Sequence, residues 1–391
     1  MTSLHVGIDA RLPDQGQGGV LSVVKSMAFA FKTFEQPKIR RTWVVLEQAS
    51  WWKTALPPQD HVVEVRAPFG AVGLSLASFA PAIASKIAPI FLKLLGDRKQ
   101  LDSLFRARRI DVVHLPYQDG ILTDLPSVYF PHDLQHLHFP EYFSSAQIRH
   151  REQRWRNRAM RAETVVAAAP HIKSDLIQRW GLDETRIMVF PFPPPPPIAM
   201  SDVQLPSLQR PYVLYPAVFW PHKNHAHLVR AMSILKQRRV EVDLVLTGSK
   251  HSNLARILQL IKMLDISDRV KYLGHVNDAL LSALFYTAEA IVVPSLSEAF
   301  SLTAFDALRY NRPLLCSDRE FFRSQCKEFA RYFDPLDPNS IANEIERQLS
   351  ENKAIGMTNA GRQIDHQGLS HELFAENLVC AYHECFNRRM N

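Results

Sequence analysis

Four polar side chains follow apolar, strand-like runs at positions where they could act on a ligand: His132, Lys223, Glu298 and Asp306. Glu298 comes shortly after the run at 290–293, and Asp306 lies in the helix-like segment that follows. In an open α/β sheet, ligands bind beyond the carboxyl ends of the strands. A helix N-terminus at that edge favours a phosphate, because its N–H groups are free and its partial charge is positive. Two carboxylates beside a phosphate are costly unless they hold something else, such as sugar hydroxyls.

Residues 298–307 read EAFSLTAFDA. This segment resembles the acidic signature of family 4 glycosyltransferases, Glu-Gly-Phe-Gly-Leu-Pro-x-x-Glu-Ala, which holds a nucleotide sugar. The spacing matches, whereas both glycines, the proline and the second glutamate differ. The resemblance implies that Glu298 holds hydroxyls of the donor sugar and that Asp306 holds those of the ribose. It also implies that backbone amides of four residues meet the phosphate: Ala299, Phe300, Ser301 and Leu302.

Lys223 stands between a strand-like run at 212–216 and a helix-like segment at 226–236. It resembles the family lysine that binds the donor diphosphate. The family often has an arginine five residues earlier, where this sequence has Val218. We therefore expect His222 or Arg11 to supply the missing charge.

His132 follows the apolar strand-like residues 128–130, in a His-Asp-Leu segment. It resembles the family histidine that reaches the donor sugar, so His132, Lys223 and Glu298 are the expected catalytic residues. Gly18 and Gly19 close a glycine loop between the strand predicted at 4–8 and the helix predicted at 20–34. Glycine lets backbone amides approach an anion closely, although a plain tight turn explains the pair equally well.

Further donor contacts are expected at two turns after strands of the second half. Gly248 follows the strand-like run 242–247, at the edge where a ligand would bind. The segment 270–276 resembles the family strand and loop beside the nucleotide base, where the backbone near His275 and Val276 would read that base.

The composition is that of a soluble globular protein, with 46% hydrophobic and 22% charged residues. The net charge of +7 suits phosphorylated ligands or an anionic membrane surface, and no base-reading motif indicates nucleic acid. The four cysteines lack the spacing of metal ligands and are expected to be reduced, buried thiols. The resemblance implies a metal-independent enzyme without a cofactor.

Two basic stretches leave alternatives open. Residues 74–95 are apolar, interrupted by prolines and lysines, and followed by arginines, so they either lie on a membrane surface or pack on their own domain. Six arginines between 149 and 161 indicate either a solvated helix face or a site for an anionic acceptor or lipid headgroup. With no leader segment and no spanning apolar run visible, we expect a protein that is cytoplasmic or peripheral on the inner face of the membrane.

The length of 391 residues and the alternation of strands and helices predict two α/β domains. Five consecutive prolines at 193–197 mark the boundary, since proline favours an extended linker. We place an N-terminal, acceptor-side domain at 1–190, a linker at 191–200 and a nucleotide-sugar domain at 201–367. The helix in 368–391 is expected to pack back on the first domain. The resemblance implies the B-type glycosyltransferase fold, two Rossmann-like doubly wound domains that face each other across a cleft.

The resulting functional hypothesis is a retaining hexosyltransferase that moves a sugar from a nucleotide sugar to a saccharide or lipid-linked saccharide. Cell-envelope polysaccharide or lipopolysaccharide biosynthesis is the expected setting, with mannosyl or rhamnosyl transfer as examples. Two alternatives stay open: a non-catalytic scaffold of a polysaccharide-assembly complex, suggested by the missing glycines and arginine, and a sugar-nucleotide epimerase.

Overall fold

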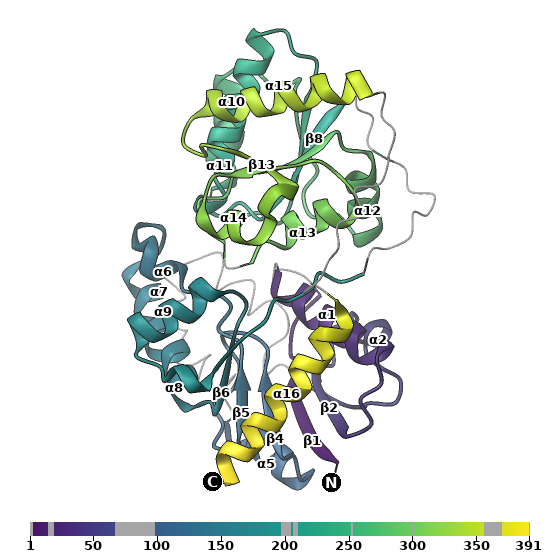
Figure 1. Ribbon diagram of the computed structural model, residues 1–391, viewed down its shortest axis with the longest axis vertical. Coiled ribbons are helices and arrows are strands. Elements are labelled where there is room, and N and C mark those ends of the chain that lie inside the picture. Colours follow the sequence, from purple (N-terminus) through teal and green to yellow (C-terminus); the bar gives the residue numbers. More distant parts are fainter. Residues whose placement is uncertain are drawn as a thin grey trace. The chain divides into compact units, whose positions relative to one another are not determined.

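The computed structural model describes residues 3–14, 19–66, 98–196, 205, 210–251, 253–298, 300–355 and 370–390. The chain forms two compact units (Figure 1). Unit 1 comprises Met1–Pro195 and His366–Asn391, and unit 2 comprises Pro196–Asp365.

Unit 1 is built on a parallel sheet with the strand order β3-β2-β1-β4-β5-β6-β7. The strands are β1 (Leu4–Asp9), β2 (Ile39–Leu46), β3 (His61–Val65), β4 (Val112–Leu115), β5 (Ser127–Tyr129), β6 (Thr164–Ala167) and β7 (Ile187–Val189). All six residues of β1 are buried, as in a parallel sheet that is covered on both faces. The strand order reverses between β1 and β4, since β2 and β3 lie on one side of β1 and β4 to β7 on the other. The carboxyl ends of β1 and β4 are therefore the expected ligand-binding edge.

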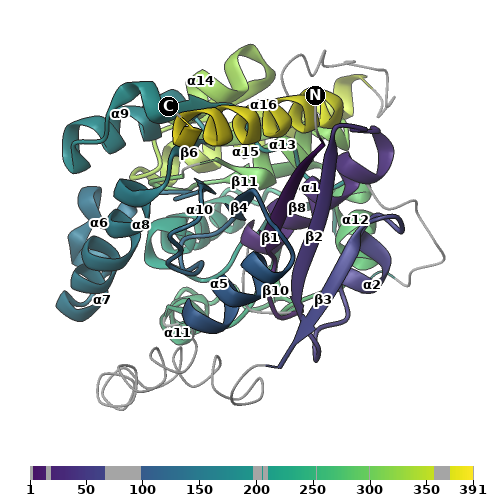
Figure 2. The ribbon, with the colours of Figure 1, turned by 90° about the horizontal axis from the view of Figure 1, so that it is seen from below.

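The helices of unit 1 vary widely in length. They are α1 (Gly19–Thr33), α2 (Trp52–Ala55), α5 (Arg98–Ala107), α6 (Gln135–His138), α7 (Ser145–His150), α8 (Arg156–Arg161), α9 (Pro170–Trp180) and α16 (His371–Met390). A single π-helical turn, Arg151–Trp155, joins α7 to α8. In Figure 2, α16 covers one face of the sheet and α5 lies on the other.

The C-terminal helix α16 is an integral part of unit 1, although it follows unit 2 in the sequence. The hydroxyl of Tyr382 lies 2.7 Å from Nδ1 of His114 on β4, and both side chains are fully buried. Phe374 packs near Phe190 and Phe192, which follow β7. Burial of these aromatic rings fixes α16 against the sheet.

Unit 2 repeats the same topology with the strand order β10-β9-β8-β11-β12-β13, again all parallel. Its strands are β8 (Tyr212–Pro216), β9 (Asp243–Thr247), β10 (Val270–Tyr272), β11 (Ala290–Val293), β12 (Leu314–Ser317) and β13 (Ala330–Phe333). Its helices are α10 (His225–Gln237), α11 (Leu254–Met263), α12 (Asp278–Thr287), α13 (Leu302–Arg309), α14 (Glu320–Cys326) and α15 (Pro338–Ile355). The order reverses between β8 and β11.

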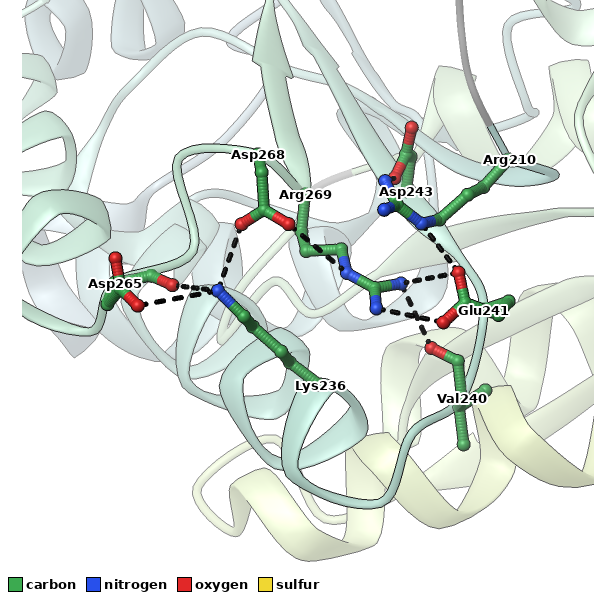
Figure 3. A network of polar contacts seen from close by, with 8 residues as sticks. All are labelled: Arg210, Lys236, Val240, Glu241, Asp243, Asp265, Asp268 and Arg269. Carbon is green, nitrogen blue, oxygen red and sulfur yellow. Dashed lines mark hydrogen bonds and ion pairs between the residues drawn. The ribbon is translucent and has the colours of Figure 1, made fainter.

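A network of charged side chains ties together the amino ends of β8, β9 and β10 (Figure 3). Arg210 Nε lies 2.6 Å from Glu241 Oε2, and Glu241 Oε1 lies 3.1 Å from Arg269 Nη2. Arg210 also reaches the buried Asp243 at 3.2 Å. The opposite, carboxyl ends of these strands carry the candidate site, so the network stabilises the sheet at the edge away from it.

Most of the predicted strands and helices are present, with differences at some of their ends. The helix predicted to begin at Val20 begins at Gly19, and the predicted basic helix contains the π-helical turn. Several elements were not predicted from the sequence, among them strand β7 and helices α2, α6, α11, α12 and α14. Cys380 is exposed, so the prediction of four buried thiols was wrong for this one. The stretch at 74–95 lies outside the described residues.

Candidate active site

Lys223 and Glu298 meet at the carboxyl edge of the unit 2 sheet, where the strand order reverses. Lys223 ends a helical turn (Pro221–Lys223) after β8, and Glu298 lies in the loop after β11. Lys223 Nζ lies 2.5 Å from Glu298 Oε1. The Glu298 side chain is 8% exposed and that of Lys223 is 21% exposed, so a partly buried cation faces a nearly buried anion. Such a pair can hold a ligand that carries both phosphate oxygens and hydroxyl groups.

The loop that carries Lys223 is held by side chains from its own strand and helix. Tyr215, the fourth residue of β8, donates its hydroxyl to the carbonyl of Lys223 at 2.9 Å. Asn224 adopts φ = 59°, a left-handed conformation that asparagine tolerates better than most residues. Its Nδ2 donates to the carbonyls of Pro294 and Pro335 at 3.0 and 2.7 Å. These bonds fix where the Lys223 side chain begins.

The loop that carries Glu298 is bonded directly to the lysine loop. Leu296 N donates to the carbonyl of His222 at 2.8 Å, and Ser295 Oγ lies 3.0 Å from the Tyr215 hydroxyl. His222 itself is buried in unit 2, where its ring lies 6.4 Å from that of Trp220. The two loops therefore form one rigid platform, and the separation of Lys223 and Glu298 is set by backbone contacts.

Helix α13 begins beside this platform. Ser301 caps it, because its hydroxyl accepts a hydrogen bond from Ala304 N at 3.4 Å. The backbone N of Ser301 donates to Gln325 Oε1 on α14, also at 3.4 Å. Phe300 stacks on Phe305 with ring centroids 4.5 Å apart. The backbone amides of Ser301 and Ala304 therefore already have long hydrogen bonds. A phosphate that bound to either amide would have to displace the present partner. Leu302 is the first helical residue, and Ala299 lies outside the described residues.

Asp306 lies one turn further along α13 and pairs with Arg309, whose Nη2 is 2.5 Å from Asp306 Oδ1. Burial raises the pKa of Asp306 to about 6, even though the Arg309 cation opposes this shift. The carboxylate is therefore engaged within its own helix. The i,i+3 spacing of Asp306 and Arg309 was visible in the sequence and is the signal that could have revealed the pair.

The turns after β9 and β10 lie close to the turn after β8. Gly248 has φ = 136°, and a side chain there would overlap the carbonyl of Ala217. Its N–H donates to the carbonyl of Gly274 at 2.8 Å. Only glycine fits such a close approach of backbones, so Gly248 shapes this edge. His275 is exposed and Val276 half-buried at the same edge.

In unit 1, the equivalent edge holds a compact polar cluster. Arg11, just after β1, donates to both oxygens of the fully buried Asp9 at 2.7 and 3.0 Å. Burial opposes ionisation of Asp9, but Arg11 and the Tyr117 hydroxyl hold its pKa below its ordinary value. The charge of Arg11 is therefore matched by Asp9 within unit 1. Gly19 opens α1 nearby in the sequence, whereas Gly18 lies outside the described residues.

His132 follows β5 in the same edge of unit 1, with φ = 58°. Its Nε2 lies 2.8 Å from the carbonyl of Pro116, which can only accept, so Nε2 carries the proton. Burial lowers the pKa of His132, so the imidazole is neutral near pH 7. Its Nδ1 is then a hydrogen-bond acceptor, suited to a sugar hydroxyl.

Among the described residues, no cluster of three or more His, Cys, Asp and Glu side chains is arranged to hold a metal ion. In the same part of the chain, no helix is long and apolar enough to cross a membrane.

Family models match most of the chain. The model of glycosyl transferases group 1 matches residues 200–363, and that of Glycosyltransferase Family 4 matches residues 53–193. The first match includes Lys223, Glu298 and Asp306, and the second includes His132.

Similar proteins with curated names include two from O-antigen synthesis. The O-antigen chain mannosyltransferase B of Escherichia coli is 24% identical over 254 residues, which cover 60% of this chain and 66% of that protein. The O-antigen chain mannosyltransferase RfbU of Salmonella typhimurium is 25% identical over 189 residues, 48% of this chain and 51% of that protein. The chain thus spans between half and two thirds of the length of these relatives.

Solved structures share the fold over nearly the whole length. The sucrose-phosphate synthase of Thermosynechococcus elongatus has a TM-score of 0.71 at 18% identity, covering 98% of this chain and 99% of that one. Anabaena Alr3699/HepE, in complex with UDP and glucose, has a TM-score of 0.66 at 16% identity and covers 96% and 98%. The two Rossmann-like units, the Lys223–Glu298 pair and both family matches lead to one conclusion: the chain belongs to the group 1, family 4 glycosyltransferases.

Proposed function

We propose that this protein is a retaining glycosyltransferase that uses a nucleotide-sugar donor and a saccharide or lipid-linked saccharide acceptor. The observation that carries the proposal is the Lys223–Glu298 pair at the point where the unit 2 strand order reverses. Mannosyl transfer in cell-envelope polysaccharide synthesis is the preferred reaction, supported by the names of the two O-antigen relatives. A nucleotide-sugar donor is supported by HepE, which was solved with UDP and with UDP-glucose.

In the proposed reaction, Lys223 leaves Glu298 and binds the donor diphosphate. Breaking the bond at the anomeric carbon places negative charge on that leaving group, and Lys223 together with the first amides of α13 stabilises it. Removing one such preorganised donor typically costs about 2.7–4 kcal/mol. The charge of the diphosphate is met by these groups, so the proposed reaction needs no metal ion.

The remaining groups position the sugar and its nucleoside. Glu298, released from Lys223, accepts hydrogen bonds from donor-sugar hydroxyls, and the neutral His132 accepts another at Nδ1. Asp306 accepts from the ribose. The acceptor hydroxyl attacks from the face that the diphosphate leaves, and a diphosphate oxygen takes its proton, so that the anomeric configuration is retained.

The direct test is a panel of UDP-, GDP- and dTDP-sugars, with release of the nucleoside diphosphate measured with and without saccharide acceptors. We expect one donor to be hydrolysed slowly by the wild type and not by Glu298→Gln. If no donor binds or reacts while the protein remains folded, the proposed activity is wrong and a scaffold role becomes the better explanation.

A further inference from the structure

The side chain of Asn224 is buried between loops of unit 2, and both ends of its amide are engaged. Its Nδ2 lies 3.0 Å from the carbonyl oxygen of Pro294 and 2.7 Å from that of Pro335. Carbonyl oxygens only accept hydrogen bonds, so the amide nitrogen faces them and donates both of its protons. Oδ1 is thereby the acceptor end, and it lies 2.5 Å from Nδ1 of His227.

His227 locks the orientation of this amide. Burial lowers the pKa of His227, and the nearby Arg230 adds to the shift, so the ring is neutral near pH 7. A neutral imidazole carries one proton, and the contact with Oδ1 places that proton on Nδ1. If the Asn224 amide were rotated by half a turn, its oxygen would face two carbonyl oxygens. The amide therefore has one favourable orientation.

The three loops that Asn224 joins include both loops of the candidate site. Asn224 directly follows Lys223 in the loop after β8, and Pro294 opens the loop after β11 that carries Glu298. Pro335 lies in the loop after β13, the edge strand of the sheet, which is separated from β8 by β11 and β12. A single side chain thus connects the ends of strands that do not all pair with one another.

Asn224 does not use its side chain as asparagine usually does at its position in a helix. It is the N-cap residue of α10, where an asparagine oxygen commonly accepts a hydrogen bond from a backbone N–H of the first turn. Asn224 makes no such bond, and its amide contacts the two proline carbonyls instead. Helix α10 therefore lacks a stabilising cap, while the amide holds the loops of the candidate site.

We propose that Asn224 is a positioning residue for sugar transfer, whose amide holds the loop after β11 against the loop after β8 so that Lys223 and Glu298 meet one donor. It acts through these two side chains and does not contact the donor. The bond from Leu296 N to the His222 carbonyl joins the same two loops, whereas Asn224 also joins the loop after β13. This inference rests on the proposed function, because it names a residue that serves the same donor site.

The first test measures how strongly Lys223 and Glu298 stabilise each other, with no substrate present. Urea unfolding of the full-length protein is measured for the wild type, Lys223→Met, Glu298→Gln and the double variant, and this double-mutant cycle gives the coupling of the pair. The cycle is repeated in an Asn224→Gly background, since glycine adopts φ = 59° without strain and lacks the amide. We expect the coupling to fall by at least half. A residue that only stabilises the fold would leave the coupling unchanged, which would overturn the proposal.

Two further backgrounds show whether the amide itself is responsible. Asn311 also lies in unit 2 with a left-handed backbone, φ = 52°, but it is exposed. The coupling in Asn311→Gly is expected to equal that of the wild type. Asn224→Asp has nearly the shape of the amide but offers no proton to either proline carbonyl, so we expect it to lose the coupling as glycine does. Full coupling in Asn224→Asp, or equal losses in Asn224→Gly and Asn311→Gly, would contradict the proposal.

A milder variant keeps the test decisive if Asn224→Gly does not fold. His227→Phe retains an aromatic ring and removes only the donor to Asn224 Oδ1, so the coupling is expected to fall by a smaller amount. In that case an unchanged coupling in His227→Phe would overturn the proposal.

The second test uses the panel of nucleotide sugars. With the donor that the wild type hydrolyses, Asn224→Gly is expected to lower kcat about 10- to 100-fold and to change the KM by about threefold or less, because the donor-binding groups are present but misplaced. A wild-type kcat in Asn224→Gly would overturn the inference and leave the proposed function standing. Loss of the coupling, in a protein with which no donor reacts, would support the role of the amide and contradict the proposed function.

Discussion

Lys223 Nζ and Glu298 Oε1 lie 2.5 Å apart, although 75 residues separate them in the sequence. Parallel pairing of β8 with β11 brings their loops together, and the bond from Leu296 N to the His222 carbonyl fixes the spacing. An ion pair at the proposed donor site means that each partner also holds the other before a ligand arrives. Activity and stability therefore depend on the same two side chains. Single and double variants can separate the effect on activity from the effect on stability.

Lys223→Met and Glu298→Gln are each expected to lower kcat for sugar transfer by about 100- to 1,000-fold, because each removes a group that meets charge or hydroxyls of the donor. Each single variant also leaves a partly buried partner without its counter-ion, so a modest loss of stability is expected. The double variant should regain stability but not activity. Thermal unfolding and nucleoside diphosphate release measure the two effects. Wild-type transfer by either single variant would contradict the assignment.

Gly248→Ala is expected to destabilise unit 2 by at least about 3 kcal/mol, because the residue has φ = 136° and its new Cβ would overlap the Ala217 carbonyl. Gly274→Ala is the matched control. Gly274 has φ = 73°, but open space surrounds its Cβ position, so the cost is about 1–2 kcal/mol. Chemical denaturation measures both. Equal destabilisation by the two variants would show that the contact with Ala217 does not matter.

Asp306 should make stability depend on pH. Burial raises its pKa to about 6, above the value of the unfolded chain, so the folded state favours the protonated carboxyl. This contribution is fully present below the unfolded pKa and is lost as the pH rises through about 6. The advantage of wild type over Asp306→Asn should thus be largest near pH 4 and shrink by up to about 3 kcal/mol toward pH 8. Denaturant unfolding at both pH values measures the difference.

Arg309→Gln provides the control for that titration. Arg309 opposes the shift, so its removal is expected to move the Asp306 transition to higher pH. An unchanged transition would mean that the ion pair with Arg309 does not act on this carboxyl.

Removal of divalent metal ions is expected to leave transfer unchanged, because Lys223 and the amides at the start of α13 meet the diphosphate charge in the proposed mechanism. The measurement is nucleoside diphosphate release before and after dialysis against EDTA, with and without added Mg²⁺. A large loss that Mg²⁺ restores would show that the proposed cationic groups are insufficient.

Much of this molecule could be predicted from the sequence. Apolar runs predicted most strands, since strands buried on both faces need continuous apolar residues. The acidic segment and the lysine loop indicated which residues would lie at strand ends, and Lys223 and Glu298 do lie in the loops that follow β8 and β11. What the sequence could not show was distance. The family resemblance put Lys223 and Glu298 at one donor site, but it did not predict their direct contact, because the spacing of the two loops depends on long-range strand pairing.

The six arginines between 149 and 161 show the same difference between what the sequence determines and what the folded structure determines. The sequence determined that six arginines would share one short segment, but their partners come from loops distant in the sequence. Only the tertiary structure decided that Arg158 is buried against Gly120 while Arg151 is stacked between two rings with an unsatisfied nitrogen. The physical reason is that burial and charge compensation depend on what packs around a side chain, and packing is a property of the folded chain.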